Sequence, residues 1–549
     1  MTHAAPSPHS LASADRAQLL ARLARERFDV VIVGGGATGA ASARDAALRG
    51  LKTALVERGD FASQTSSASS QLIHGGIRYL QYGNFGLVFE GLAERRRLMR
   101  AAPHLCRPVD FVFPGYAGTK PSLGTIGLGI RLYNLLALGR PPSKRERLSP
   151  ERLGSLAPRL RRDGLQGAQV YQDCQTDDAR LVLENVLDAE SAGAVCLNHV
   201  EASPWRRDER GFSISVRDRL HEGAPFEVHG RMVVNATGPF SDAYAGTRKL
   251  RPTLGVHVVL PAERLPTAGR VFVLNAPRDG RLFFVIPAGA RTYVGTTDTD
   301  WQPPRDTTEP GRGVHARRSD VDYLLEAANA AFPEARLTHA DVISTWAGLR
   351  PLVASQDDTP SATSREHEID FEAGALTITG GKLTTMRKMA EETVDRLVAW
   401  GARRGLSAIP RACRTRTRAL PGGGAWTALP EALPEEVRTH LHLRYGSRAE
   451  AVARLALSEP DLAQPLTPDL PELWAEAVFA IDHERAETVE DVLRRRLSMF
   501  RYARDQGLEA APRVAALLAA KKGSSPQTQS AWIEAYARAV ASTRSWKEE

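Results

Sequence analysis

Cysteine is scarce in this chain, and it has no long apolar run. The four cysteines among 549 residues are scattered and form no Cys-x-x-Cys pair. This argues against a disulfide framework or a metal site and favours a reducing compartment. No stretch of 18 apolar residues occurs, so the sequence predicts no membrane-spanning helix. We interpret residues 1–27 as a short arm and a basic amphipathic helix near 14–27, not as a secretion signal.

The charge balance is basic but does not point to one kind of partner. The formal net charge is +8, with 42% hydrophobic and 25% charged residues, which is ordinary for a soluble globular protein. Such an excess is compatible with nucleic acid, an anionic membrane or an acidic substrate. The charge is spread along the chain and no RNA-binding or helix-turn-helix signature occurs, so we expect no nucleic-acid partner.

The stretch FDVVIVGGGATGA, residues 28–40, joins an apolar run to a glycine-rich turn. Its β-branched residues predict a strand buried on both faces, and Gly34, Gly36 and Gly39 follow in G-x-G-x-x-G register. Such glycines permit a tight turn, close approach to a pyrophosphate and close packing of helix on strand. The next apolar run ends in Glu57, 23 residues after Gly34, where an acid would bind ribose hydroxyls. The pattern predicts dinucleotide binding; the alternative is a structural βαβ unit with a chance acid.

The segment after Glu57 favours FAD over a nicotinamide cofactor. It is a long Ser/Thr/Gly stretch, whose small donors suit a large cofactor that lies extended across the domain. A nicotinamide enzyme usually continues into another simple βαβ unit. The alternative is a polar surface loop, which His74, Arg78 and Tyr79 at the end of the stretch disfavour.

Several motifs occur together and in a defined order along the chain. They are TSSASSQLIHGGIRYL (65–80), DDARLVLENV (177–186), VVNATGPF (233–240), VGTTD (294–298), WAGLRPL (346–352) and GGKLTTMRKMAE (380–391). In combination they resemble the FAD-dependent, respiratory, quinone-linked glycerol-3-phosphate dehydrogenase family. LRYGSRA (443–449) and AETVEDVLRRR (486–496) resemble that family's helical domain, so the likeness covers nearly the whole chain after residue 28.

The predicted fold is α/β, with a discontinuous Rossmann-like FAD-binding domain, an antiparallel-sheet substrate domain and a C-terminal helical domain. Four apolar runs at short spacing within 251–345 predict the antiparallel sheet, and Ala/Leu/Arg/Glu patterns after residue 420 predict helices. The predicted boundaries are 1–27 for the N-terminal arm and basic helix, 28–105, 165–250 and 346–405 for the FAD-binding domain, 106–164 and 251–345 for the substrate domain, and 406–549 for the helical domain.

Two later segments are also expected at the cofactor. Residues 231–238 form an apolar run that ends in small residues, and 375–385 is a strand followed by two glycines and a helix start that would face an anion or the flavin ring. Together with the family likeness, this predicts FAD contacts at Gly34, Gly36, Gly39, Glu57, Thr65, Ser66, Ser67, Ser69, Ser70, His74, Gly75, Gly76, Val200, Ala236, Gly238, Thr297, Asp298, Gly380, Gly381, Lys382, Leu383 and Thr384.

A phosphorylated polyol needs cations for its phosphate. Arginine suits phosphate because its planar fork makes paired, charge-assisted hydrogen bonds. Arg350 lies in an apolar stretch, where an unpaired arginine would be costly to bury; we expect it to contact phosphate or flavin, with a structural ion pair as the alternative. Arg78, Tyr79, Lys382 and Thr384 complete the predicted substrate site, although Tyr79 could equally be a core aromatic.

The base that takes the hydroxyl proton is expected to be a histidine, the usual choice near neutral pH. The family pattern points to His257, with Arg350 beside it as a catalytic residue; a structural histidine is the alternative. His74 is the second candidate, with flavin orientation as its expected task. The family usually has lysine at the positions of Gln71 and Leu254, and both losses remove positive charge from around the site.

The resemblance implies oxidation of sn-glycerol 3-phosphate to dihydroxyacetone phosphate by hydride transfer to FAD, with the electrons passed to a membrane quinone. One alternative is an oxidase of the same substrate that uses oxygen. Another is a flavin oxidoreductase of a different small hydroxy or amino acid, because arginines bind carboxylate as readily as phosphate.

A quinone acceptor implies a cytoplasmic protein held peripherally on the inner face of the cell membrane. Segments 20–28, 128–148 and 414–420 are basic, and 128–148 also carries apolar residues, so they suit an anionic lipid surface. Solvated segments are the alternative. The sequence leaves open whether the chain forms a homodimer.

Overall fold

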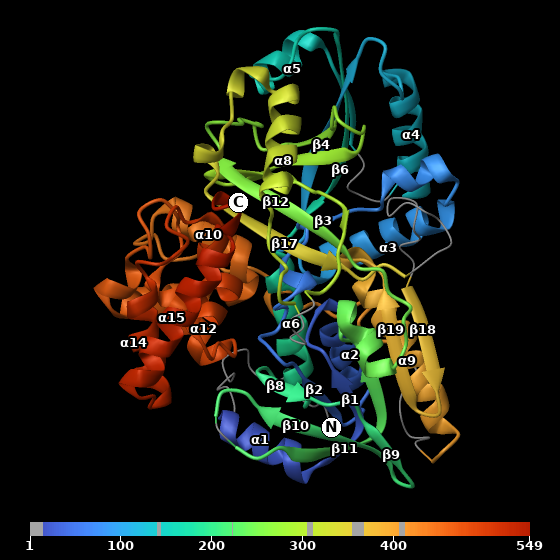
Figure 1. Cartoon of the computed structure of the whole chain (residues 1–549), viewed down its shortest axis with the longest axis vertical. Coiled ribbons are helices and arrows are strands. Elements are labelled where there is room, and N and C mark those ends of the chain that lie inside the picture. Colours follow the sequence, from blue (N-terminus) through green and yellow to red (C-terminus); the bar gives the residue numbers. More distant parts are fainter. Residues whose placement is uncertain (1–14, 140–143, 222, 305–310, 354–366, 406–411) are drawn as a thin grey trace.

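The computed structural model describes residues 15–139, 144–221, 223–304, 311–353, 367–405 and 412–549. Two large sheets follow one another along the long axis of the molecule, and the C-terminal helices group at one side (Figure 1). The predicted α/β class with a C-terminal helical domain is confirmed. None of the helices in the described ranges is long and apolar enough to cross a bilayer.

The first sheet has a parallel centre that carries the glycine-rich turn. β1 (Arg27–Val33) pairs in parallel with β2 (Thr53–Val56) and β11 (Phe226–Asn235), and β2 pairs in parallel with β7 (Val195–Leu197). The edges are formed by β8 (Val200–Ala202), β9 (Arg206–Asp208), β10 (Gly211–Asp218), β18 (His367–Glu372) and β19 (Ala375–Gly380). The sheet is therefore Rossmann-like and drawn from distant parts of the chain.

Both faces of this sheet are covered, because alternate residues of its central strands point in opposite directions. One face packs under α2 (Ala37–Leu48), α6 (Asp178–Ser191) and α9 (Met386–Ala402). The other face packs on β10 and on α1 (Arg16–Arg25), the basic helix predicted near 14–27. The apolar side chains of α1, Leu19 and Leu23, are buried against the sheet.

The second sheet is mainly antiparallel. Its strands run in the order β16 (Thr299–Asp300), β12 (Thr253–Pro261), β15 (Arg291–Gly295), β14 (Leu282–Ala288), β13 (Val271–Asn275), β4 (Arg107–Tyr116), β6 (Leu165–Gln175) and β3 (Leu72–Ile73), with β17 (Ser344–Arg350) paired to β12 and β5 (Arg145–Leu148) to β6. One face packs on α5 (Pro150–Leu156) and α8 (Arg318–Ala331). The other packs on α3 (Phe85–Ala101), α4 (Leu123–Leu136) and the 3-10 helix η2 (Ile77–Tyr82).

Three strands of the second sheet lie outside the segments predicted for the substrate domain. β3, β6 and β17 pair with this sheet, whereas the boundaries 28–105, 165–250 and 346–405 assign most of their residues to the FAD-binding domain. The second sheet therefore takes in residues 165–175 and 344–350, which adjoin or cross the proposed boundaries at 165 and 346. A strand's partner is set by packing that local sequence does not encode.

The C-terminal domain is helical and has its own core. It contains α10 (Glu435–Tyr445), α11 (Ala449–Ser458), α12 (Trp474–His483), the π-helical turn η10 (Asp491–Arg496), α13 (Met499–Tyr502), α14 (Ala511–Lys522) and α15 (Pro526–Ser542). The short helix α13 contacts β17 of the second sheet. The helical domain therefore reaches the strands around the predicted site.

Candidate active site

The turn between β1 and α2 has backbone approaches that a side chain would block. Gly34 has φ +106°, and a Cβ there would lie 2.5 Å from the carbonyl oxygen of Ala236. A Cβ on Gly39 would lie 1.8 Å from the carbonyl oxygen of Gly34. Gly36 caps α2, whose free N–H groups begin beside it. The residues present therefore fit the pyrophosphate cradle that an FAD-binding domain needs.

Glu57 closes the cradle at the end of β2. Its Oε2 accepts a hydrogen bond from the Gly35 N–H at 2.6 Å, and its Oε1 accepts one from the Gly59 N–H at 2.8 Å. Burial raises the pKa of Glu57, and these two N–H donors act against that rise. The Val200 N–H donates to the Glu57 carbonyl at 2.7 Å, which brings Val200, another predicted FAD contact, to the Glu57 end of the cradle.

The serine-rich loop after Glu57 links the cradle to the second sheet. Ser66 Oγ accepts from the Ala37 N–H at 2.9 Å, at the start of α2. Thr65 Oγ1 donates to the Leu349 carbonyl at 2.6 Å, in β17. Ser69 Oγ donates to Asp178 at 2.8 Å. The predicted FAD contacts 65–70 therefore lie between the two sheets.

His257 lies at the middle of β12, and Ser70 of the same loop reaches it. Ser70 Oγ is 2.9 Å from Nε2 of His257, and Trp346 stacks on the imidazole with ring centres 4.7 Å apart. A Cβ on Gly295, the cross-strand neighbour, would lie 2.1 Å from the imidazole. Burial, followed by the charges of Arg350 and Arg501, lowers the pKa of His257 well below its ordinary value. The imidazole is therefore neutral and able to accept a proton.

Arg350 has protein partners, as the structural alternative anticipated. Its Nη1 is 2.8 Å from Asp298 Oδ1, and its Nη2 donates to Thr296 Oγ1 and the Thr297 carbonyl at 3.0 Å each. The guanidinium lies over Gly255 of β12, where a Cβ would be 2.5 Å from Nη2. Arg350 thus lies with the predicted residues Thr297 and Asp298, on the same strand face as His257.

Gln71 and Leu254, the two positions at which the family usually has lysine, differ in their surroundings. Leu254 is buried in the core under α8 and is three residues from His257, so its side chain points to the opposite face of β12. Gln71 lies beside the site, where its Oε1 accepts a hydrogen bond from Tyr502 at 2.7 Å. The loss of a lysine at 254 therefore removes no charge from this face.

Lys382 and Tyr79 form a second group of predicted residues, and Arg78 precedes Tyr79 on η2. Lys382 Nζ lies 3.8 Å from the centre of the Tyr79 ring, and Arg78 contacts the hydroxyl of Tyr82 at 3.4 Å. Within the described residues, neither cation forms an ion pair with a carboxylate. The group can therefore accept an anion.

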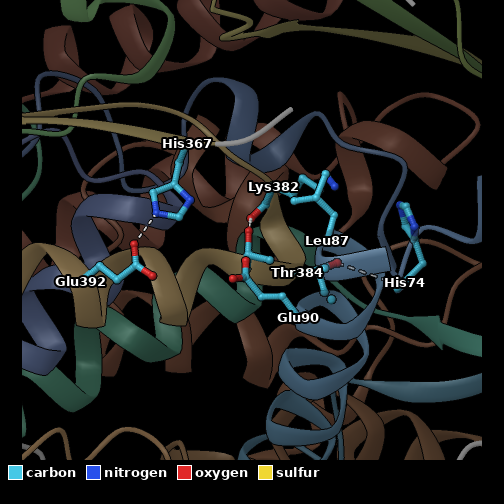
Figure 2. A pocket seen from close by; sticks show the side chains of 11 residues that line it. His74, Leu87, Glu90, His367, Lys382, Thr384 and Glu392 are labelled. Carbon is cyan, nitrogen blue, oxygen red and sulfur yellow. Dashed lines mark hydrogen bonds and ion pairs between the residues drawn. The ribbon is translucent and has the colours of Figure 1, made fainter. Parts of the chain in front are cut away.

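A cavity of about 420 Å³ brings four of the predicted residues together: His74, Gly75, Lys382 and Thr384. Figure 2 shows His74, Lys382 and Thr384 on its wall, with the His74 N–H donating to Thr384 Oγ1 at 3.2 Å. Lys382 and Thr384 come from the turn and 3-10 helix η6 (Leu383–Thr385) after β19, where Gly380 and Gly381 have φ of +71° and +83°. His257 and Arg350 do not line this cavity.

The remaining predicted cofactor residues lie at strand ends and turns. The Ala236 N–H donates to the Val33 carbonyl at 2.9 Å directly after β11, and Gly238, with φ +59°, follows it. The Gly75 N–H donates to the Tyr133 hydroxyl at 2.8 Å. A Cβ on Gly76 would lie 2.4 Å from the Tyr79 ring. These residues shape the backbone around the cradle and the cavity.

Sequence reasoning missed three side chains in the cavity. His367 Nε2 is 2.8 Å from Glu392, and Glu90 faces them from α3, where burial raises the pKa of its carboxyl (Figure 2). Trp346 was quoted within a motif but given no role. The pairing of β18 with β19 sets His367 opposite Gly380. Knowledge of this pairing could have identified His367 and Glu392 as cavity residues, whereas no local sequence pattern marks them.

The chain matches known flavoproteins over most of its length. A family model described as FAD dependent oxidoreductase matches residues 29–405, and one described as the C-terminal domain of alpha-glycerophosphate oxidase matches 413–529. A glycerol-3-phosphate dehydrogenase from Synechocystis sp. is 35% identical over 88% of this chain and 91% of its own length. Glycerol-3-phosphate dehydrogenase 2 from Mycobacterium tuberculosis is 38% identical over 93% of this chain and 87% of its own length.

A solved structure agrees with these sequence matches. The glycerol-3-phosphate dehydrogenase from Bacillus halodurans complexed with FAD has a TM-score of 0.77 at 28% identity, over 97% of this chain and 98% of that one. Its likeness extends over both sheets and the C-terminal helices. The chain therefore belongs to the FAD-dependent glycerol-3-phosphate dehydrogenase family.

Proposed function

We propose that this protein uses FAD to oxidise sn-glycerol 3-phosphate to dihydroxyacetone phosphate. The observation that carries the proposal is Lys382, a cation on the cavity wall whose Nζ lies 3.8 Å from the centre of the Tyr79 ring and which has no carboxylate partner within the described residues. Lys382 lines the cavity with His74 and Thr384, where a dinucleotide cradle alone would not require a cation. Arg78, on η2, likewise has no carboxylate partner within the described residues. Relatives named glycerol-3-phosphate dehydrogenase at 35–38% identity support the same substrate.

In this proposal the phosphate is held by Arg78 and Lys382, and Thr384 adds a hydroxyl near them. His257 takes the proton of the secondary hydroxyl at Nε2, the nitrogen that Ser70 Oγ contacts at 2.9 Å. Arg350 keeps positive charge near the imidazole and fixes the Thr297–Asp298 segment. When bound along Gly34–Gly39, Glu57 and the serine loop, FAD supplies hydride acceptance and then gives up two electrons.

The proposed electron acceptor is a membrane quinone, reached from the inner face of the cell membrane. Exposed apolar side chains support a membrane contact: six of them lie on η2, α3 and α4 and just beyond α4, namely Tyr82, Phe85, Phe89, Leu128, Leu135 and Leu138. α4 packs against both η2 and α3. Exposed Arg131 lies on α4 between Leu128 and Leu135 in the sequence. The helix therefore offers apolar side chains for insertion into a bilayer and a positive charge for the lipid head groups.

An anaerobic visible spectrum tests the substrate and the acceptor together. Flavin bands should bleach when sn-glycerol 3-phosphate is added to the purified holoprotein, and return when a soluble quinone analogue follows. Bands indifferent to this substrate but bleached by a small hydroxy or amino acid would overturn the substrate. Bands that return as fast in air as with the quinone analogue would instead support an oxidase.

The phosphate contacts can be tested in the same experiment. Arg78→Gln and Lys382→Gln should each raise the concentration of glycerol 3-phosphate needed for half-bleaching by about 10–100-fold, because each removes a charge-assisted hydrogen bond worth about 1.5–3 kcal/mol. Lys249→Gln is the matched control, since Lys249 pairs with Asp370 on the surface at 2.7 Å. An unchanged half-bleaching concentration in both site variants would contradict the assigned phosphate contacts.

A further inference from the structure

The C-terminal domain places two consecutive side chains beside His257. Arg501 and Tyr502 end α13, and the second sheet holds their backbone. Ser344 Oγ donates to the Arg501 carbonyl at 2.6 Å, and Arg291 Nε donates to the Tyr502 carbonyl at 2.7 Å. Arg501 is 7% exposed. With the backbone tied to β15 and β17, both side chains are fixed parts of the folded site.

Arg501 reaches His257 through one aromatic ring. Its guanidinium carbon lies 5.0 Å from the centre of the Trp346 ring. The same ring stacks on the imidazole of His257, with ring centres 4.7 Å apart and an interplanar angle of 14°. Trp346 and His257 are also direct cross-strand partners on β17 and β12. Guanidinium, indole and imidazole are therefore linked in sequence, and a shift of the first displaces the last.

Arg501 also holds the loop that carries Ser70. Its Nη2 donates to the Ser67 carbonyl, and its Nη1 is 3.3 Å from Asp178 Oδ1. Asp178 in turn accepts from the N–H and hydroxyl of Ser69 at 3.0 and 2.8 Å. The loop is therefore fixed one residue before the serine that contacts Nε2 of His257.

The charges that face His257 come from three elements. Arg350 lies on β17 and Arg501 on α13, and both lower the pKa of His257 after burial, the largest cause. Asp178, on α6, is the counter-charge of Arg501. Tyr293, on β15, lies edge-on with its ring centre 6.1 Å from the imidazole. Removal of Arg501 would take away one cation and leave the carboxylate of Asp178 without it.

We propose that Arg501 is a positioning residue for His257: it fixes the imidazole plane through Trp346 and fixes Ser70 through Ser67 and Asp178. The proposal rests on the proposed function, in which His257 is the base. It assigns the C-terminal helical domain a part in completing the active site. Tyr502 acts with it, because its hydroxyl holds Gln71 at the end of the same loop.

The test uses full-length, FAD-loaded protein and four variants. Anaerobic stopped-flow would measure flavin bleaching by saturating glycerol 3-phosphate from pH 4 to 9, with bound FAD and melting temperature recorded for each. The variants are Arg501→Gln, Arg501→Lys, Asp178→Asn and the control Arg504→Gln. Arg504 lies three residues along the chain but its side chain is 66% exposed.

The pH dependence separates positioning from simple stability. In Arg501→Gln the acid limb of the bleaching rate should move up by about one pH unit, since protonated His257 cannot act as a base and its protonation becomes easier. In Arg501→Lys the acid limb should lie at the pH found for the parent, because the charge is kept. In Asp178→Asn it should lie at lower pH, and in Arg504→Gln at the same pH as in the parent. If the limb stays in place in Arg501→Gln, the proposal is overturned, even where rate or melting temperature falls.

A second readout is independent of the substrate. Titration of the His257 ring followed by NMR on ¹³C-histidine-labelled protein, assigned with His257→Gln, should show the same order of midpoints. If parent flavin does not bleach with glycerol 3-phosphate, the proposed function fails while the titration still tests Arg501. If Arg501→Gln takes up no FAD, Asp178→Asn decides alone: a midpoint that is not lowered overturns the proposal.

Discussion

At the scale of single residues, the cofactor cradle depends on backbone atoms that nearly touch. Ala236, at the end of β11, comes close to Gly34, at the end of β1, because the two strands are parallel neighbours. Gly39 then brings α2 against the Gly34 carbonyl. Glycine is required at both positions because a Cβ atom would not fit, and at Gly34 also because the residue has a positive φ.

A matched pair of glycine substitutions tests this. Gly34→Ala should abolish retention of FAD and lower stability by about 1–3 kcal/mol, because it combines φ +106° with a Cβ 2.5 Å from the Ala236 oxygen. Gly193→Ala has a similar φ of +95° but no atom within 4 Å. This variant should retain FAD, and its stability should fall only by the cost of a positive φ at alanine. The flavin-to-protein absorbance ratio and the melting temperature measure both; full FAD retention in Gly34→Ala would contradict the argument.

Much of the residue-level site could be predicted, and the rest had a clear physical obstacle. The turn glycines and Glu57 are identified by spacing within one βαβ unit, where local sequence fixes geometry. The ion pair of Arg350 with Asp298 could be offered only as an alternative, because it depends on the pairing of β12 with β16 and β17. The contact of Arg501 with Trp346 spans more than 150 residues of chain and leaves no local pattern.

At the scale of elements, the three basic segments predicted to meet lipid have different surroundings. The apolar residues of α1 are buried against the first sheet. In segment 414–420, Arg416 pairs with Glu391 at 2.6 Å and Arg418 with Asp188 at 2.9 Å. The segment around α4 differs, because Leu128 and Leu135 are 65% and 69% exposed. Of these segments, α4 has the surface best suited to a bilayer.

Charge placed on α4 should weaken membrane binding. Leu128→Glu and Leu135→Glu should each reduce co-sedimentation with vesicles of anionic phospholipid several-fold, since each removes apolar burial and adds repulsion. Leu457→Glu is the control, because Leu457 is an exposed leucine on α11 of the C-terminal domain. Bleaching by glycerol 3-phosphate in solution should not change. Equal loss of vesicle binding in all three variants would argue against α4 as the membrane contact.

Element types were predictable where element partners were not. The apolar runs of the second sheet and the helices after residue 420 follow from periodicity. The membership of β3, β6 and β17 in the second sheet does not, because each is set by a strand far away in the sequence. This is why the second sheet includes strands at the boundaries proposed at 165 and 346.

At the scale of the whole molecule, buried ion pairs fasten the C-terminal domain to the first sheet. Glu484, after α12, is 2.6 Å from Arg180 of α6, and Arg448 is 3.0 Å from the same carboxylate. Asp60, in the loop after β2, is bound by Arg495 and Arg496 at 2.5 Å each. With His199 and Asp491, Asp60 has the composition of a cation site, but these guanidinium groups already supply its positive charge.

Acid should loosen this attachment through Glu484. Burial opposes its ionisation, yet Arg180 and Arg448 lower its pKa from 4.5 to about 2. A lowered folded-state pKa stabilises the protein above pH 4.5, and that stability is lost as the pH falls through 2. At pH 7 it amounts to about 3 kcal/mol, so Glu484→Gln should lower the melting temperature there.

The dependence on pH is the decisive part of this experiment. The difference in melting temperature between the parent and Glu484→Gln should narrow between pH 5 and 2. Glu534→Gln, which breaks an exposed ion pair with Arg538 in α15, should leave the melting temperature nearly unchanged. A difference that stays constant with pH would show that Glu484 acts through packing and not through its charge.

The scattered origin of the first sheet has a consequence for synthesis of the protein. β1 lies between β2 and β11, and β11 in turn pairs with β19, so a growing chain cannot finish the sheet until residue 380 has left the ribosome. The contacts around His257 are then completed only after Arg501, near the C-terminal end of the chain, has been synthesised. Contacts so distant form slowly and late. A translation product that ends before Arg501 would therefore lack a complete redox centre, and the flavin reaction would be confined to molecules whose synthesis has passed this residue.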